Sequence, residues 1–121
     1  MIVQLETPEA ISRMAEIAGV PGIDGVFVGP GDLAASMGLI GQIGHDDVQA
    51  ALADAAAQAA RLDLPIGIVG PSPEMVRRFM DYGYSFVAIA SDMVLMMTRA
   101  RAVLSELRDD APVEAPAGAA Y

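Results

Sequence analysis

Short apolar runs alternate with amphipathic stretches along the chain, and this alternation predicts four strand–helix units. The runs are almost continuously apolar, as expected for parallel strands that are covered on both faces. The stretches between them carry apolar residues at intervals of three and four, which is typical of helices lying on a sheet. The predicted strands are residues 2–5, 23–28, 64–69 and 86–90, and helices are expected at about 8–19, 48–61, 74–82 and 93–108.

Residues that begin and end helices support these boundaries. Thr7 and Pro8 form an N-cap and a proline at the first helical position, and Gly83 is expected to end the third helix. Residues 29–45 are rich in glycine and are predicted to be a long loop, with Asp46 capping the next helix. Residues 109–121 consist mainly of alanine, proline, glycine and acids, and are predicted to be a disordered tail.

Four successive strand–helix units predict an α/β fold. Four such units make half of an eight-unit (β/α)8 TIM barrel. Because the chain begins inside a predicted strand, we expect the other half of the barrel to be missing. A four-stranded open sheet is the alternative that this pattern leaves open.

Composition narrows the classes of partner. The chain has 121 residues, 54% hydrophobic, with seven basic residues against sixteen acidic ones and a net charge of -9. This balance argues against nucleic-acid and anionic-membrane surfaces, which need clustered Lys and Arg. No apolar run reaches the roughly 18 residues of a membrane span, so a soluble, cytoplasmic protein is expected. The absence of cysteine excludes disulfides and thiolate metal sites, which leaves oxygen ligands or the single His45 for any metal.

Two carboxylates stand where parallel α/β proteins collect their functional groups, at the C-terminal ends of strands. Glu6 follows the first predicted strand and Asp32 follows the second. Neighbouring strands lie about 5 Å apart, so the two side chains are candidates to share a hard divalent cation. Capping of the following helices is the competing interpretation. The Gly-Pro-Gly-Asp sequence at 29–32 allows main-chain N–H groups to approach a ligand closely, or forms only a tight turn.

Several motifs resemble the HpcH/HpaI aldolase family. They are Val3-Gln4-Leu5-Glu6-Thr7, residues 25–38 (GVFVGPGDLAASMG), residues 45–48 (HDDV) and residues 86–92 (FVAIASD), and together they cover roughly the first hundred residues. The resemblance implies that residues 1–108 are the C-terminal half of a TIM barrel. It also implies a lyase that cleaves 4-hydroxy-2-oxo acids, such as 2-keto-3-deoxy sugar acids or 4-hydroxy-2-oxoheptanedioate, to pyruvate and an aldehyde.

The same resemblance implies a site. It assigns a divalent metal, Mg²⁺, Mn²⁺ or Co²⁺, to Glu6 and Asp32. The residues implied to bind substrate are Gln4, Gly29, Pro30, Gly31 and Asp32. The family's proton-moving histidine and pyruvate-holding arginine have no counterpart here, so no catalytic residue is expected within this chain, and His45 is expected to be solvated or to cap a helix. The chain contains no lysine, which excludes the lysine-imine class of aldolase.

Two other functions remain open at this stage. One is a non-enzymatic half-barrel that dimerises to cover its open sheet edges and binds at most a metal and an oxo acid. The other is a lyase of the citrate-lyase or malyl-thioester type. The family resemblance also implies a homo-oligomer in which the last helix packs on a neighbouring subunit.

Overall fold

The computed structural model describes residues 1–108, and the predicted tail at 109–121 lies outside the described residues. The chain divides into two units, Met1–Ile89 and a second that begins at Ala90. The first unit contains the whole sheet and five helices. The second contributes α6, Asp92–Arg108, to the described residues. Across residues 1–108, no helix is both long enough and apolar enough to cross a bilayer.

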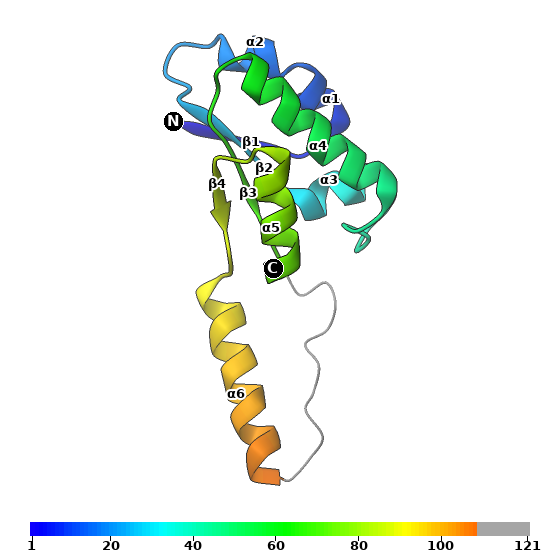
Figure 1. Cartoon of the computed structure of the whole chain (residues 1–121), viewed down its shortest axis with the longest axis vertical. Coiled ribbons are helices and arrows are strands. Elements are labelled where there is room, and N and C mark those ends of the chain that lie inside the picture. The colour runs from blue at the N-terminus through cyan, green and yellow to red at the C-terminus, as the bar shows by residue number, and fades with distance from the viewer. Residues whose placement is uncertain (109–121) are drawn as a thin grey trace. The chain divides into compact units, whose positions relative to one another are not determined.

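The sheet consists of four parallel strands whose spatial order follows the sequence, β1-β2-β3-β4 (Figure 1). Each strand is separated from the next by at least one helix, which is the connection that parallel neighbours require. The α/β prediction is therefore confirmed. The strands are β1 Ile2–Leu5, β2 Gly25–Val28, β3 Ile66–Val69 and β4 Phe86–Ala88.

Five helices connect the strands of the first unit (Figure 1). Two boundaries are as predicted: Thr7 caps the first helix, and Gly83 ends the last in the left-handed conformation at φ 105°. Ser72 caps the last helix. The helices are α1 Pro8–Ser12, α2 Met14–Ala18, α3 Pro30–Ser36, α4 Asp46–Arg61 and α5 Pro73–Tyr82.

Three local predictions were wrong. The expected continuous helix to about residue 19 breaks at Arg13, whose backbone (φ -99°, ψ 14°) leaves the helical region. The expected loop after β2 begins with helix α3, because Pro30 suits the first helical position and burial of Leu33 and Ala34 stabilises the turn despite the glycines. Helix α4 is capped by His45, whose Nδ1 accepts a hydrogen bond from the Asp47 N–H at 3.2 Å, and Asp46 is its first residue.

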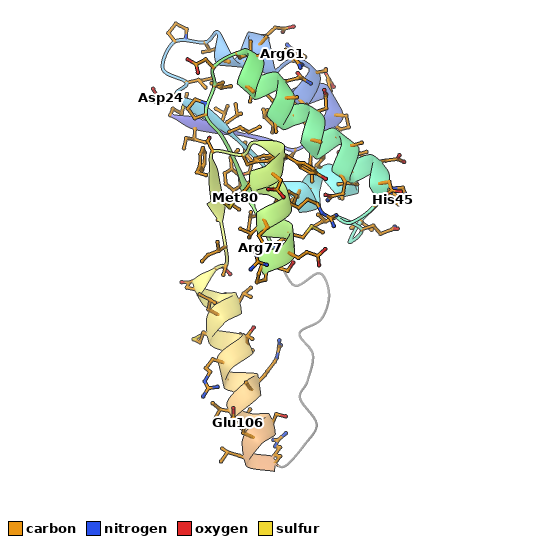
Figure 2. All side chains as sticks on the ribbon, in the orientation of Figure 1. Asp24, His45, Arg61, Arg77, Met80 and Glu106 are labelled. Atoms are coloured by element: carbon orange, nitrogen blue, oxygen red, sulfur yellow. The ribbon has the colours of Figure 1, made fainter. Side chains whose placement is uncertain are left out.

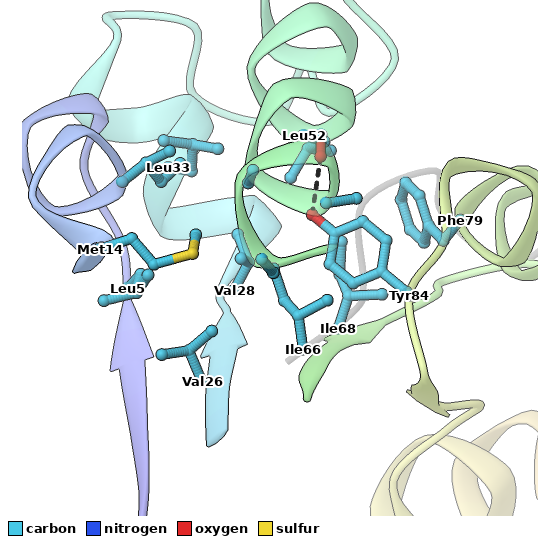
Figure 3. Close-up of a cluster of buried hydrophobic side chains, with 14 of the residues drawn as sticks. Leu5, Met14, Val26, Val28, Leu33, Leu52, Ile66, Ile68, Phe79 and Tyr84 are labelled. Atoms are coloured by element: carbon cyan, nitrogen blue, oxygen red, sulfur yellow. Dashed lines mark hydrogen bonds between the residues drawn. The ribbon is translucent and has the colours of Figure 1, made fainter. Parts of the chain in front are cut away.

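The core lies between one face of the sheet and the helices (Figure 3). Alternate strand residues point into it, and they pack against fully buried side chains of α2, α3, α4 and α5. Tyr84 closes the core beside α4, where its hydroxyl donates a hydrogen bond to the Leu52 carbonyl at 3.0 Å. The strand residues that face the helices are Val3, Leu5, Val26, Val28, Ile66, Ile68 and Val87.

The opposite face of the sheet carries the other set of alternating residues. The rings of Phe27 and Phe86 lie on this face with centroids 6.1 Å apart. Gly67, between them in the register, leaves room for the Phe86 ring, since a Cβ on Gly67 would lie 2.0 Å from Phe86 Cε2. Within residues 1–89 the helices contribute their buried apolar residues to the core on the other face, so this second face is left open.

Candidate functional site

The C-terminal ends of β1 and β2 bring the predicted site residues to one edge of the sheet. The register pairs Leu5 with Val28, so Glu6 and Gly29 are the next residues on neighbouring strands. The Gly29 N–H donates a hydrogen bond to the Leu5 carbonyl at 3.2 Å, which extends the pairing by one residue. Asp32 follows in the first turn of α3. The strand pairing therefore places both carboxylates at the same rim.

Gly29 is the point around which the predicted side chains gather. A Cβ placed on this residue would lie 2.9 Å from Gln4 Nε2, 3.3 Å from Asp32 Oδ2 and 3.4 Å from Glu6 Cγ. Gln4 Nε2 also donates a hydrogen bond to Glu6 Oε1 at 2.7 Å. Three polar side chains, Gln4 and Glu6 from β1 and its end and Asp32 from α3, thus converge on the space that the missing side chain of Gly29 leaves free.

Burial differs between the backbone and the side chains of this site. Gly29 and Pro30 are buried and Gly31 is half-buried, whereas Gln4 and both carboxylates are exposed. The backbone is consequently held by the core, and the polar side chains remain accessible to ions and small molecules from water.

The structure bears on the competing interpretation, that the carboxylates cap helices. Thr7, and not Glu6, caps α1: its Oγ1 accepts a hydrogen bond from the Ala10 N–H at 3.0 Å. The N-cap of α3 is Gly29, without a side-chain hydrogen bond, and Asp32 lies inside the first helical turn. Neither carboxylate is used as an N-cap, so both are free to serve another role.

The donor set at this rim fits a hard divalent cation. Mg²⁺ and Mn²⁺ are commonly held by one or two carboxylates, with water or substrate oxygens in the remaining positions. Throughout residues 1–108, no three or more His, Asp or Glu side chains gather to hold a metal. Glu6 and Asp32 would therefore be the only charged ligands that these residues supply, and several coordination positions would remain for substrate.

The basic residues of the first unit lie on helices or directly beside them. His45 is the N-cap of α4, while Arg61 and Arg77 lie on α4 and α5 (Figure 2). Arg13 forms ion pairs with Glu16 at 3.1 Å and Glu9 at 3.8 Å. The position of His45 agrees with the expectation that this residue caps a helix.

Sequence reasoning assigned Gly29 to the substrate-binding backbone but missed its second role. The residue is also the place where the absence of a side chain lets Gln4, Glu6 and Asp32 meet. No local pattern signals this role, because it arises from the register between β1 and β2.

Several known proteins are similar to this chain in sequence. The sequence profile of the HpcH/HpaI aldolase/citrate lyase family matches residues 1–98. The chain belongs to this family. It is 45% identical over 118 residues to the 2-dehydro-3,6-dideoxy-6-sulfogluconate aldolase of Pseudomonas putida, a match that covers 98% of this chain and 46% of that protein. It is 40% identical over 124 residues to the hydroxypyruvate/pyruvate aldolase of Cupriavidus necator, covering 100% of this chain and 46% of that protein.

Solved structures agree on the fold. The crystal structure of an HpcH/HpaI aldolase/citrate lyase family protein from Burkholderia cenocepacia superposes with a TM-score of 0.80 and 34% identity, covering 88% of this chain and 42% of that one. The chain thus spans slightly less than half the length of these relatives. The HpcH/HpaI member described here is a half-barrel of the (β/α)8 type.

Proposed function

We propose that this chain supplies the cation- and pyruvate-binding part of a metal-dependent aldolase that cleaves 4-hydroxy-2-oxo acids to pyruvate and an aldehyde. The convergence of Gln4, Glu6 and Asp32 around Gly29 carries this proposal. The names of the P. putida and C. necator relatives, both aldolases, support the reaction class. Suitable substrates are 2-keto-3-deoxy sugar acids and 4-hydroxy-2-oxoheptanedioate.

In this proposal, Glu6 and Asp32 would hold Mg²⁺, Mn²⁺ or Co²⁺. When bound, such a cation supplies Lewis-acid stabilisation of the negative charge that develops on the pyruvate keto oxygen as the carbon–carbon bond breaks. Gln4 orients the Glu6 carboxylate through the 2.7 Å hydrogen bond from its Nε2. Because Glu6 is exposed and would otherwise sample many rotamers, this bond reduces the entropy that is lost when the carboxylate binds.

The backbone from Gly29 to Asp32 is proposed to receive the pyruvate carboxylate. The first N–H groups of a helix have no partner within it, so those of Gly31 and Asp32 are available at the start of α3. Pro30 has no N–H to offer, but its burial holds this turn against the core. The missing side chain at Gly29 leaves space for the ligand beside the two carboxylates.

The proposal assigns binding, and not proton transfer, to this chain. His45 is engaged in capping α4, and the 121 residues contain no lysine to form an imine with the substrate. Groups that move protons during turnover would therefore come from outside the described residues.

Mn²⁺ binding, followed by electron paramagnetic resonance of the free ion, tests the metal assignment. Glu6→Gln and Asp32→Asn are each expected to weaken binding at least about tenfold, since each removes one of two charged ligands. Glu74→Gln and Asp54→Asn, which change exposed acids on α5 and α4, are the matched controls and should leave the affinity unchanged. Equal losses in all four variants would reduce the effect to general electrostatics and refute the site.

Pyruvate binding is tested by the relaxation of water protons around the bound Mn²⁺. If pyruvate occupies coordination positions, it displaces water, and the relaxation enhancement falls as pyruvate is added; acetate at the same concentration controls for the carboxylate alone. An enhancement that pyruvate changes no more than acetate would contradict the assignment of a 2-oxo-acid ligand.

A further inference from the structure

An open cavity of about 390 Å³ lies at the edge of the sheet where the strands begin. Its walls come from residue 60 and residues 63–66, which lead from α4 into β3, and from Gly83 and Ser85, which lead from α5 into β4. All of these residues belong to the segment 60–85, inside the first unit. Because the strands are parallel, this edge is opposite the one that carries Glu6 and Asp32.

Every main-chain N–H group on these walls already has an acceptor. Ala60 donates within the hydrogen-bond ladder of α4, and Pro65 has no N–H. The other five wall residues donate as follows: Asp63 to the Ala60 carbonyl at 3.3 Å, Leu64 to the Ala59 carbonyl at 3.0 Å, Ile66 to Ser85 Oγ at 3.0 Å, Gly83 to the Met80 carbonyl at 3.0 Å, and Ser85 to the Ile66 carbonyl at 2.9 Å. The main chain of the walls therefore offers a ligand no free donor.

The polar side chains on the walls are free only as acceptors. Ser85 Oγ donates its hydrogen to the Ile66 carbonyl at 3.0 Å and accepts from the Ile66 N–H, which leaves one of its two lone pairs unused. An ionised carboxylate such as that of Asp63 can only accept, and within residues 1–108 this one forms no hydrogen bond or ion pair. An occupant of the cavity must consequently bring the donors.

The charge around the cavity is negative. Helices α4 and α5 both end here, and the C-terminal end of a helix carries a partial negative charge. Arg61, at the end of α4, is basic (Figure 2), but it is not one of the wall residues and forms no ion pair with Asp63. The helix ends and the carboxylate thus favour a cation.

Asp63 supplies this charge from an unfavourable backbone conformation. Its φ of 50° makes it the one residue other than glycine with a positive φ among residues 1–108. It follows the C-cap of α4, a position where glycine is the usual residue because it adopts this conformation without strain. Glycine would end the helix more easily, but it would remove the carboxylate from the cavity.

We propose that this cavity binds a small organic amine, as a primary ammonium group attached to a compact apolar body. An ammonium has three donors and no acceptor, which matches the free acceptors of Asp63 and Ser85. The side chains of Ala60, Leu64 and Pro65 would contact the apolar body. The volume lies in the range of roughly 300–1,000 Å³ that is usual for small-molecule sites. The inference rests on this edge of the sheet and does not depend on the proposed function.

Amide NMR of the 121-residue chain during titration with benzylammonium chloride tests the proposal. Saturable shifts are expected at the amides of Asp63, Leu64, Gly83 and Ser85. Benzyl alcohol has nearly the same shape without the charge, and benzoate reverses the charge, so neither should shift these amides to saturation. Potassium chloride at the same ionic strength controls for inorganic cations.

Two variants at Asp63 separate binding from folding. Asp63→Asn keeps the size and tolerates a positive φ, and it should weaken benzylammonium binding at least about fivefold because the charge is lost. Asp54→Asn, which changes an exposed acid of α4 outside the cavity, is the matched control and should leave the affinity unchanged. Asp63→Gly should abolish saturable binding and yet raise the urea midpoint of unfolding, since glycine relieves the strain.

Four results would overturn the inference. They are the absence of saturable shifts at these amides with benzylammonium, equal shifts with benzyl alcohol, equal shifts with potassium chloride, and an equal loss of affinity in Asp63→Asn and Asp54→Asn. Equal shifts with the alcohol would reduce the cavity to an apolar surface, and equal shifts with the salt would reduce it to a site for inorganic cations.

Discussion

Replacing Gly29 with alanine separates the geometry of the site from the stability of the fold. The backbone of Gly29, at φ -86° and ψ 96°, is accessible to alanine without strain. Alanine is a poorer N-cap than glycine by up to about 1 kcal/mol, but it also lowers the entropy of the unfolded chain by roughly 0.4–1 kcal/mol. These terms nearly cancel, so the free energy of unfolding should change by less than about 1 kcal/mol.

The effect on the site should be larger than the effect on the fold. The new methyl group would lie 2.9 Å from Gln4 Nε2, closer than carbon and nitrogen normally approach, so the exposed Gln4 side chain must move. Its hydrogen bond to Glu6 is then lost or lengthened, and Asp32 Oδ2, at 3.3 Å, is crowded as well. A hydrogen bond to a charged group contributes about 1.5 kcal/mol at the low end, which suits an exposed pair and corresponds to roughly tenfold weaker Mn²⁺ binding.

Mn²⁺ titration and urea unfolding of the same variants check this prediction. Gly44→Ala is the control, because its new methyl group would meet nothing nearer than Met75 Cε at 3.8 Å. In a Gln4→Ala background, Gly29→Ala should have a smaller effect, since the atom it displaces is gone. Unchanged Mn²⁺ affinity in a folded Gly29→Ala protein would refute the argument that these side chains act together around Gly29.

Two further predictions concern the core. Burial, and to a lesser extent Tyr82, raises the pKa of Tyr84 above its ordinary value of 10.0, so the folded state retains the proton. The stability from this group is therefore fully present below about pH 10 and declines above it, by up to about 1.4 kcal/mol per pH unit. Tyr84→Phe should lower the free energy of unfolding by about 1 kcal/mol at neutral pH, because the hydrogen bond to the Leu52 carbonyl is lost. It should also flatten the fall of that free energy above about pH 10. Urea unfolding at neutral pH and above about pH 10 measures both effects. Gln49→Leu should cost about 1–3 kcal/mol, because buried Gln49 donates to the Ile43 carbonyl at 2.7 Å and accepts from the Tyr82 hydroxyl at 3.2 Å. Gln58→Leu, which loses only an exposed contact with Asp54, should cost less than about 0.5 kcal/mol, and equal losses in the two variants would contradict this account.

Sequence alone determined the repeating elements and the identity of the candidate ligands. The continuous apolar runs predicted parallel strands, and the residues after the first two runs, Glu6 and Asp32, were predicted to reach the same edge. Local chemistry also predicted the left-handed end of α5 at Gly83 and the cap at Thr7. These features are readable because each depends on residues within a few positions of one another.

Only the tertiary structure decided how the site is assembled. Helix α3 replaced an expected loop because burial of Pro30, Leu33 and Ala34 outweighs the low helix propensity of neighbouring glycine. The meeting of Gln4, Glu6 and Asp32 around Gly29 depends on the register between two strands whose residues lie more than twenty positions apart in sequence. A one-residue slip would turn Gln4 to the opposite face, so no local pattern could specify it. The sequence therefore named the candidate ligands, and the pairing of β1 with β2 brought them together.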